Sequence, residues 1–318
     1  MDRIARTITP VAPFDFELTA GYLTYFQGRY ATDSLTDGVY RRLLDLDGKL
    51  VLASVSSAGS LEEPALAVEL QAEELTTSVA EQVTDQVAWI LGVGQDLMPF
   101  YALVQSDPAM SAITQRFHGL HMPHTASVFE ALVLAILGQQ IATNVARIIR
   151  TLLIETHGPR QTIEGETYYA FPRPETLAAL RVEDLRGLKL SQRKAEYVHG
   201  IACAALDDPE GMEGLHRMDD EAVIQHVTSL RGVGQWTAQW LLIRALGRPD
   251  ALPLGDLALR RVVSRLYFQE EPLNDAQVED FCRRWSPWRT YATTYMFTAM
   301  RTRSEERRVG KECRSRWS

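Results

Sequence analysis

Cysteine is scarce in this chain, with Cys203, Cys282 and Cys313 the only three among 318 residues. Their odd number and wide spacing argue against a disulfide framework, and three scattered thiols do not supply the four that an iron-sulfur cluster needs. Long apolar runs are scarce as well. No stretch approaches the about 20 apolar residues of a membrane span, and the first twenty residues lack the apolar core of a secretory signal. We therefore expect reduced thiols in a cytoplasmic protein.

Positive charge is the smaller share of the ionisable residues, because 33 Lys and Arg stand against 41 Asp and Glu. A net charge of −8 argues against non-specific coating of nucleic acid, although a local basic face can still act within an acidic chain. The last sixteen residues, 303–318, differ from the rest because nine are charged and none follows an apolar period. They resemble the in-frame translation of a sequencing-adapter oligonucleotide, so we expect a non-native tail there and exclude it from the fold.

Strand signals are concentrated in the first part of the chain. Apolar runs flank Asp47-Gly48, which is a two-residue hairpin signal, and residues 39–71 as a whole read as β structure. A polar helical segment follows over residues 72–91. We therefore predict a small α+β domain over residues 1–88.

The rest of the chain, after residue 88, has the pattern of an all-helical body in which strand signals nearly vanish. Apolar residues recur at helical spacing from Phe129 to Leu153, and a break at Gly138-Gln139-Gln140 predicts two helices that meet at a polar corner. Further helices are expected over residues 175–188, 192–206, 219–230, 235–247, 257–268, 275–285 and 288–301. The predicted fold class is mainly α, with about ten helices after the small N-terminal α+β domain.

The segment LRGVGQWTAQW, which begins at Leu230, predicts a helix-hairpin-helix. Asp219 can cap the helix before it, the stretch from Arg231 to Gly234 makes a tight turn, and Gln235 opens the next helix. Free amides at the start of that helix suit a phosphate, although a plain glycine cap between packed helices is the alternative interpretation. Between residues 231 and 265 there are six arginines against two aspartates, a local basic excess consistent with phosphate contacts.

Asp256 follows a turn that contains Pro253 and Gly255, and by position it caps the helix beginning at Leu257. The pattern L-x-G-V-G-x-W-T-A, followed by P-x-G-D-L-A-x-R-R with the acid twenty residues after Trp236, resembles the signature of the helix-hairpin-helix DNA glycosylase superfamily. The likeness is greatest to the bacterial 3-methyladenine DNA glycosylase II family and extends over most of residues 1–302.

This resemblance implies a helix-hairpin-helix glycosylase architecture in three parts. The α+β domain, residues 1–88, would come first. One helical subdomain, residues 126–248, would carry the hairpin. A second, formed by residues 89–125 together with 249–302, would contribute the side of a cleft that holds the catalytic aspartate.

The resemblance also implies roles for particular side chains. Asp256 would be the catalytic carboxylate, and the damaged base would be held by Trp236, Trp240 and Phe297. Gln140, or Gln139 beside it, would enter the gap left in the base stack. DNA phosphates would be bound by Gly232, Val233, Gly234, Gln235, Thr237, Arg231 and Arg260. Ordinary core packing of the aromatic rings and an ordinary amide at a helix corner are the alternatives. A monovalent cation at the hairpin carbonyls is a further family feature.

The chemistry needs only one carboxylate if the leaving base is already activated. A fixed negative charge near the sugar stabilises the cation that develops there, or orients the attacking water. An N-alkylated purine departs as a neutral base, so no second acid is required. Superfamily members that also cut the backbone carry a lysine where Trp236 stands, so no lyase activity is expected. The expected partner is duplex DNA with flipped-out 3-methyladenine or 7-methylguanine, bound by a monomer without a cofactor.

Two other functions stay open. The same scaffold would suit a glycosylase for oxidised, deaminated or mismatched bases, and a non-catalytic module would bind DNA without releasing a base.

Two further motifs carry weaker signals. His118, His121 and His124 share a metal-like spacing, but Gly119 and Pro123 interrupt any common helical face, so no metal is expected. Residues 185–198 resemble a helix-turn-helix, in which Lys189 and Lys194 are expected to have structural roles on a packing helix.

Overall fold

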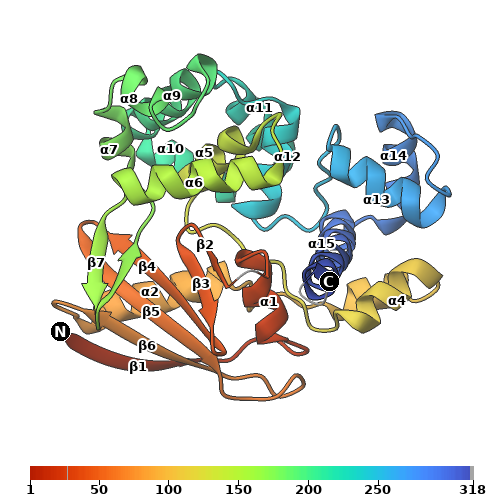
Figure 1. Cartoon of the computed structure of the whole chain (residues 1–318), viewed down its shortest axis with the longest axis horizontal. Coiled ribbons are helices and arrows are strands. Elements are labelled where there is room, and N and C mark those ends of the chain that lie inside the picture. The colour runs from red at the N-terminus through yellow and green to blue at the C-terminus, as the bar shows by residue number, and fades with distance from the viewer. Residues whose placement is uncertain (27, 316–318) are drawn as a thin grey trace.

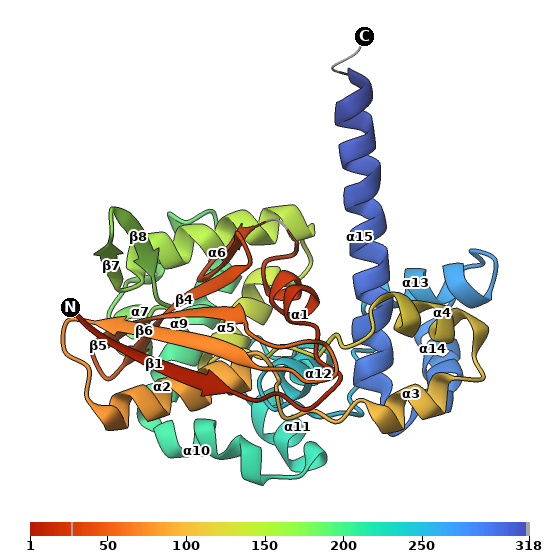
Figure 2. The ribbon, with the colours of Figure 1, turned by 90° about the horizontal axis from the view of Figure 1, so that it is seen from below.

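The computed structural model describes the backbone of residues 1–26 and 28–315, and side chains as far as Thr302. The expected tail therefore has no described side chains, Cys313 included, and residues 316–318 lie outside the described part altogether. The described backbone of this tail continues the last helix, α15 (Arg289–Ser315), which projects well beyond the body of the protein (Figure 2). A foreign origin of the tail stays a prediction.

A six-stranded antiparallel sheet forms the N-terminal part, in the order β1-β6-β5-β4-β3-β2 (Figure 1). The predicted hairpin is confirmed, because β4 (Val39–Leu46) and β5 (Lys49–Ser57) pair around Asp47-Gly48. Both turn residues have positive φ, 50° and 94°, as a tight two-residue hairpin requires. The other strands are β6 (Leu66–Ala72), which was expected, and β1 (Asp2–Ile8), β2 (Arg29–Tyr30) and β3 (Asp33–Thr36), which were not.

Two helices accompany the sheet. α1 (Phe16–Leu23) begins where the Asp15 side chain accepts the amide of Leu18, and α2 (Thr77–Ile90) is capped in the same way by Thr76. Buried valines of α2, at every fourth position, share one hydrophobic core with the sheet residues Val55 and Leu70. This amphipathic packing is what the polar helical segment predicted.

The rest of the chain is mostly helical, as expected. The helix after α5 (Val128–Gly138) is α6 (Thr143–His157), so the two predicted helices do meet at the Gln139-Gln140 corner. The remaining α-helices are α3 (Met98–Val104), α4 (Pro108–Arg116), α7 (Pro174–Ala178), α8 (Val182–Arg186), α9 (Gln192–Asp207), α10 (Pro209–Glu213), α11 (Asp220–Thr228), α12 (Gln235–Arg244), α13 (Leu257–Tyr267) and α14 (Asp275–Cys282). Short 3-10 turns cover Gly214–Arg217 and Arg283–Trp285.

The expectations for this part were wrong at two places. Residues 175–188 form two short helices rather than one, because Arg181 and Asp184 cap a new start at α8 through reciprocal contacts. Residues 160–169 form a hairpin of β7 (Arg160–Ile163) and β8 (Glu166–Tyr169), where strands were thought nearly absent. Ile163 packs against Leu43 and Leu52, so this hairpin is supported by the N-terminal sheet.

Three main hydrophobic cores organise the described residues. One joins the sheet to α2, one joins α5, α9, α11 and α12, and one joins α3, α4, α13 and α15. Trp240 of α12 packs against both helical cores, and Tyr22 of α1 belongs to the third. Helix α12 therefore lies at the border between the two helical groups, between α5–α11 and α13–α15 in Figure 1. The predicted domain boundaries stay a prediction.

A buried ion cluster fixes α5 to the sheet. Arg42 of β4 lies 3.0 Å from Asp33 of β3 and 2.6 Å from Glu130 in the first turn of α5, and all three side chains are almost fully buried. Tyr40 also donates to Asp33. Because a buried arginine needs both charges and hydrogen-bond partners, this cluster holds α5 in one orientation. Among the described residues, no helix is long and apolar enough to cross a membrane.

Candidate active site

The predicted helix-hairpin-helix is formed by α11, a tight turn and α12. Asp219 caps α11 by accepting the amide of Ala222 at 2.8 Å. Gly234 is the N-cap of α12, and no side chain among the described residues caps that end. The first amides of α12, beginning with Gln235, are therefore available to an external acceptor, and the helix dipole favours an anion there.

The two glycines of the turn have different roles. Gly232 has φ of +93°, and an added Cβ would lie 2.3 Å from the ring of Tyr197, so only glycine fits against this neighbour. At Gly234 nothing lies within 4 Å of such a Cβ. The close approach at Gly232 is thus to the protein's own tyrosine, and the open face that a bulky partner could use is at Gly234.

Four other residues predicted to bind phosphate already make contacts within the protein. The Val233 amide donates to Leu230 O, and Thr237 is buried with its hydroxyl accepting from Gln139, so neither of these groups faces solvent. Arg231 pairs with Glu196 at 3.0 Å, and Arg260 lies 3.6 Å from Asp275.

The local arginine excess is also offset by acids that come from other parts of the chain. Four of the six arginines have a carboxylate partner, namely Arg231, Arg248, Arg260 and Arg265. Arg261 is exposed and has no carboxylate partner among the described residues. The basic face suggested by counting residues 231–265 alone is therefore weaker in the folded protein.

Asp256 is held by three hydrogen bonds. It is the N-cap of α13, where Oδ1 accepts the amides of Ala258 at 2.8 Å and Leu259 at 3.2 Å. Its Oδ2 accepts the indole N–H of Trp236 at 3.0 Å. The capping interpretation is thus correct and does not compete with a catalytic one, because a carboxylate has about four acceptor positions and three are filled here. The side chain is only partly buried, so the fourth position on Oδ2 can be reached.

The three aromatic residues predicted to form the base pocket lie together. The rings of Trp236 and Trp240 are 6.2 Å apart at 67°, and those of Trp240 and Phe297 are 6.1 Å apart and nearly parallel. Trp236 and Trp240 are partly exposed, whereas Phe297 is 4% exposed and belongs to the core. The Nε1 of Trp240 is buried without an acceptor. Phe297 therefore belongs to the hydrophobic core, and its ring also stacks on that of Trp240. Its role in the base pocket stays a prediction.

Two partly buried arginines, not predicted as site residues, lie next to this aromatic group. Arg244 follows Trp240 by one turn on α12, Arg301 follows Phe297 by one turn on α15, and both guanidinium groups lie over the ring of Tyr22, at 5.5 and 4.5 Å. Nη1 of Arg301 is buried without a hydrogen-bond partner. The i, i+4 spacing of each arginine from an aromatic residue was the available sequence signal.

The positive charge of the arginines lowers the pKa of a neighbouring tyrosine, Tyr25. Burial raises the pKa of the Tyr25 phenol, but the positive charges of Arg301, Arg150 and Arg244 outweigh burial and lower the pKa to about 8. The guanidinium of Arg301 lies 4.4 Å from the centre of the Tyr25 ring. The surroundings of Tyr25 are thus positively charged.

The two glutamines at the α5–α6 corner differ in their contacts. Gln139 donates from Nε2 to the carbonyl of Gly232 and to the hydroxyl of Thr237, both at 2.9 Å, so its side chain is committed to the hairpin. Gln140 is exposed, with φ of +53°. Of the two candidates, Gln140 is the one whose side chain is exposed and can extend away from the protein surface. The monovalent cation expected by resemblance at the hairpin carbonyls stays a prediction, and two of these carbonyls, those of Leu230 and Gly232, accept hydrogen bonds.

The histidine spacing does not form a metal site. His121 is fully buried and its ring nitrogens face carbonyl oxygens of Gly92 and Pro13, whereas His118 stacks on Tyr101. Burial, above all, lowers the pKa of His124 to about 3. Among the described residues no three His, Cys, Asp or Glu side chains could hold a metal together.

The expectation for residues 185–198 is confirmed for Lys194 and wrong for Lys189. Lys194 has a structural contact, but Lys189 is exposed in the turn before α9 and does not lie on a packing helix. Lys194 instead reaches back to the Gln139-Gln140 corner, where its Nζ donates to two carbonyls.

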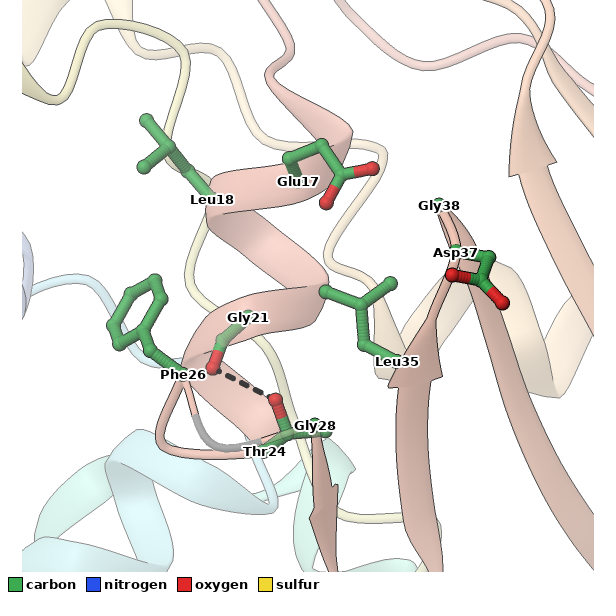
Figure 3. A pocket seen from close by; sticks show the side chains of 9 residues that line it. All are labelled: Glu17, Leu18, Gly21, Thr24, Phe26, Gly28, Leu35, Asp37 and Gly38. Atoms are coloured by element: carbon green, nitrogen blue, oxygen red, sulfur yellow. Dashed lines mark hydrogen bonds between the residues drawn. The ribbon is translucent and has the colours of Figure 1, made fainter.

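Two hollows of the surface lie away from these residues. One, of about 370 Å³, is bounded by α1 and by the turn between β3 and β4, with the carboxylates of Glu17 and Asp37 at its edge (Figure 3). The other, of about 180 Å³, is lined by residues of α11, α12 and the segment 250–254. Neither is lined by Asp256 or the three aromatic residues. The rings of Trp236, Trp240 and Phe297 thus form an aromatic wall beside the carboxylate of Asp256, and their role as a receptacle for the base stays a prediction.

Comparison with known proteins places this geometry in a family. Residues 133–287 match the HhH-GPD family, described as "HhH-GPD superfamily base excision DNA repair protein". The DNA-3-methyladenine glycosylase of Bacillus subtilis is 29% identical over 220 residues, which cover 69% of this chain and 73% of that protein. The solved structure of the 3-methyladenine DNA-glycosylase from Archaeoglobus fulgidus is 30% identical with a TM-score of 0.80, over 92% of this chain and 97% of that one.

The fold is shared more widely than the sequence. An 8-oxoguanine glycosylase/lyase of Clostridium acetobutylicum, solved in complex with double-stranded DNA, is only 16% identical but has a TM-score of 0.74 over 95% of this chain and 98% of its own. At that identity the likeness concerns the fold alone.

Proposed function

From the premise that this chain belongs to the HhH-GPD superfamily of base excision DNA repair proteins, we propose that it is a monofunctional DNA glycosylase for alkylated purines. It hydrolyses the N-glycosidic bond of cationic bases such as 3-methyladenine and 7-methylguanine in duplex DNA, after the nucleotide has been flipped out. Relatives named as 3-methyladenine glycosylases support this choice of substrate. The enzyme acts as a monomer and needs no cofactor.

The observation that carries the proposal is the carboxylate of Asp256 bound to the indole of Trp236. Three hydrogen bonds orient the carboxylate, and one acceptor position stays open for the sugar or for water. At an effective dielectric constant of about 20 and a distance of about 4 Å, opposite unit charges attract by about 4 kcal/mol, which is roughly a thousandfold in rate. Since the donors are fixed before substrate arrives, little reorganisation is needed when positive charge develops on the sugar.

The aromatic wall supports the choice of a cationic base. The faces of Trp236 and Trp240 favour a positively charged ring over a neutral one by about 0.5–2 kcal/mol. The indole N–H of Trp236 is already used by Asp256, so this residue serves the base with its ring and the carboxylate with its nitrogen. A base that departs as a neutral molecule needs no general acid, in keeping with a single carboxylate.

The proposed DNA contacts follow from the open end of α12. Phosphate binds the first amides of α12 at Gly234 and Gln235, where the backbone is unobstructed, and Arg231 lies nearby on the turn. Gln140 enters the gap left by the flipped nucleotide. Trp236 stands where superfamily members that cut the backbone carry a lysine, and an indole cannot form a Schiff base, so no lyase step is proposed.

A second substrate class has a specific observation in its favour. Arg244 and Arg301 place two positive charges beside the aromatic wall, and like charge disfavours a cationic base. These donors suit instead a neutral base with carbonyl oxygens, such as a deaminated or oxidised purine. The alternative is therefore a glycosylase for such lesions on the same scaffold.

The decisive experiment compares wild type with Asp256→Asn on methylated duplex DNA, with the released bases identified by mass spectrometry. Asparagine keeps an oxygen that caps α13 but loses the charge, so the variant should fold and should release bases at least about a hundredfold more slowly. If Asp256→Asn releases bases as fast as wild type, Asp256 is not the catalytic carboxylate. Release only of deaminated or oxidised bases from suitable DNA would favour the second class, and binding without release would indicate a non-catalytic module.

A further inference from the structure

We propose that Lys194 is a positioning residue that holds the corner carrying Gln140, and that Gln139 joins this corner to the hairpin as one rigid unit. The inference rests on the proposed function, in which Gln140 enters the gap left by the flipped nucleotide. Binding of a phosphate at the start of α12 and insertion of Gln140 into the base stack would then be coupled.

Lys194 contacts the end of the helix that leads to the corner. It lies in the first turn of α9, and its Nζ donates to the carbonyl oxygens of Leu137 at 3.0 Å and Gln139 at 2.6 Å. The last carbonyls of a helix lack partners within the helix and carry partial negative charge. The ammonium group therefore satisfies two of these carbonyls and also interacts favourably with the dipole of α5.

Other contacts restrain the corner itself and the end of α5 that leads to it. Arg150 of α6 donates from Nε and Nη2 to the carbonyl of Leu134, at 3.1 and 2.6 Å. Gln139 reaches in the opposite direction, to Gly232 and Thr237 on the hairpin. The corner is thus tied to α9 and to the hairpin, and one turn before the corner α5 is tied to α6.

Gln140 has a backbone conformation that requires such restraint. A residue with a side chain is uncommon at φ of +53°, and a glutamine persists there when the surrounding structure imposes it. The consequence is an exposed side chain projecting from a fixed backbone, which is what insertion between bases demands. Burial and the charge of Arg150 lower the pKa of Lys194, so placing the lysine here has a cost that the two carbonyl contacts offset.

A purely structural lysine makes a different prediction from a positioning lysine. If Lys194 only stabilises the packing of α9 on α5, its loss should slow excision equally on every DNA. If it positions Gln140, its loss should matter when a partner base must be displaced and the stack refilled, and should matter little when no partner base is present.

The test uses Lys194→Met and Lys194→Arg in the full chain, with Lys189→Met as the matched control because Lys189 is exposed in the turn before α9. Single-turnover excision is measured for one methylated purine, opposite its normal partner and opposite an abasic site. We expect Lys194→Met to be slower by about tenfold or more on the paired lesion and by less than about threefold on the unpaired one. Lys194→Arg should restore most of the rate, and the control should match wild type.

A second readout separates this inference from the proposed function. In a duplex with 2-aminopurine beside the lesion, fluorescence reports unstacking on binding, whether or not a base is released. A smaller fluorescence rise for Lys194→Met at saturating protein supports the inference even if wild type releases nothing, which would refute only the glycosylase proposal. Equal losses on both DNAs, or an unchanged fluorescence rise, would overturn the role of Lys194.

Discussion

Replacing Trp236 by phenylalanine tests how much the carboxylate depends on its indole partner. The change keeps an aromatic ring beside the base but removes the N–H that lies 3.0 Å from Oδ2 of Asp256. The two backbone amides of Ala258 and Leu259 still hold Oδ1, so the cap of α13 survives. The variant should therefore fold normally, with a carboxylate that is free to turn about its Oδ1 contacts.

The expected loss follows from the strength of one hydrogen bond to a charged acceptor. Such a bond contributes about 1.5–3 kcal/mol, which corresponds to a roughly tenfold to hundredfold fall in the rate of base release. Binding of undamaged duplex DNA should change little, because the phosphate contacts at α12 do not involve the indole nitrogen.

Trp240→Phe provides the matched control. It is the same chemical change one helical turn away, but the Nε1 of Trp240 has no acceptor, so no hydrogen bond is lost. Single-turnover release of 7-methylguanine from duplex DNA, with denaturant unfolding of each variant, measures both effects. If Trp236→Phe and Trp240→Phe lose equal activity, or if Trp236→Phe loses none, the carboxylate does not depend on this contact and the reasoning fails.

Two further predictions concern the hairpin and the positive charge around Tyr25. Gly232→Ala should lower the free energy of unfolding by about 2–4 kcal/mol, because its Cβ would meet the Tyr197 ring at 2.3 Å and its φ is positive, whereas Gly234→Ala should leave stability unchanged and weaken DNA binding, as denaturant and DNA titrations would show. Tyr25, with its pKa lowered to about 8 despite burial, should ionise before the other tyrosines in an ultraviolet titration. Since the unfolded chain keeps that proton up to about pH 10, the free energy of unfolding gains a contribution that grows between pH 8 and 10, and Tyr25→Phe should remove both effects.

Much of the fold could be predicted because its signals are local. Asp47-Gly48 favours a tight hairpin by the conformations its residues accept, and the break at Gly138 divides one apolar stripe into two helices. The missed strands lacked such signals. β1 pairs with β6, which lies 58 to 70 residues later, and β7–β8 is held by Ile163 against the sheet, so both depend on contacts between distant segments.

The features of the site also divide into those that depend on spacing along the chain and those that depend on tertiary contacts. The amino-acid sequence alone determined the hairpin, the cap at Asp256 and the aromatic residues one turn apart on α12, because each follows from spacing within a few residues of the chain. Only the tertiary structure decided that the Trp236 indole holds Asp256, that Gln139 binds the hairpin while Gln140 stays free, and that Lys194 supports their corner. The same holds for the acids that offset most of the arginine excess. The reason is physical: hydrogen bonds and ion pairs depend on distances of a few ångströms between atoms, and spacing along the chain fixes those distances only within one turn or helix.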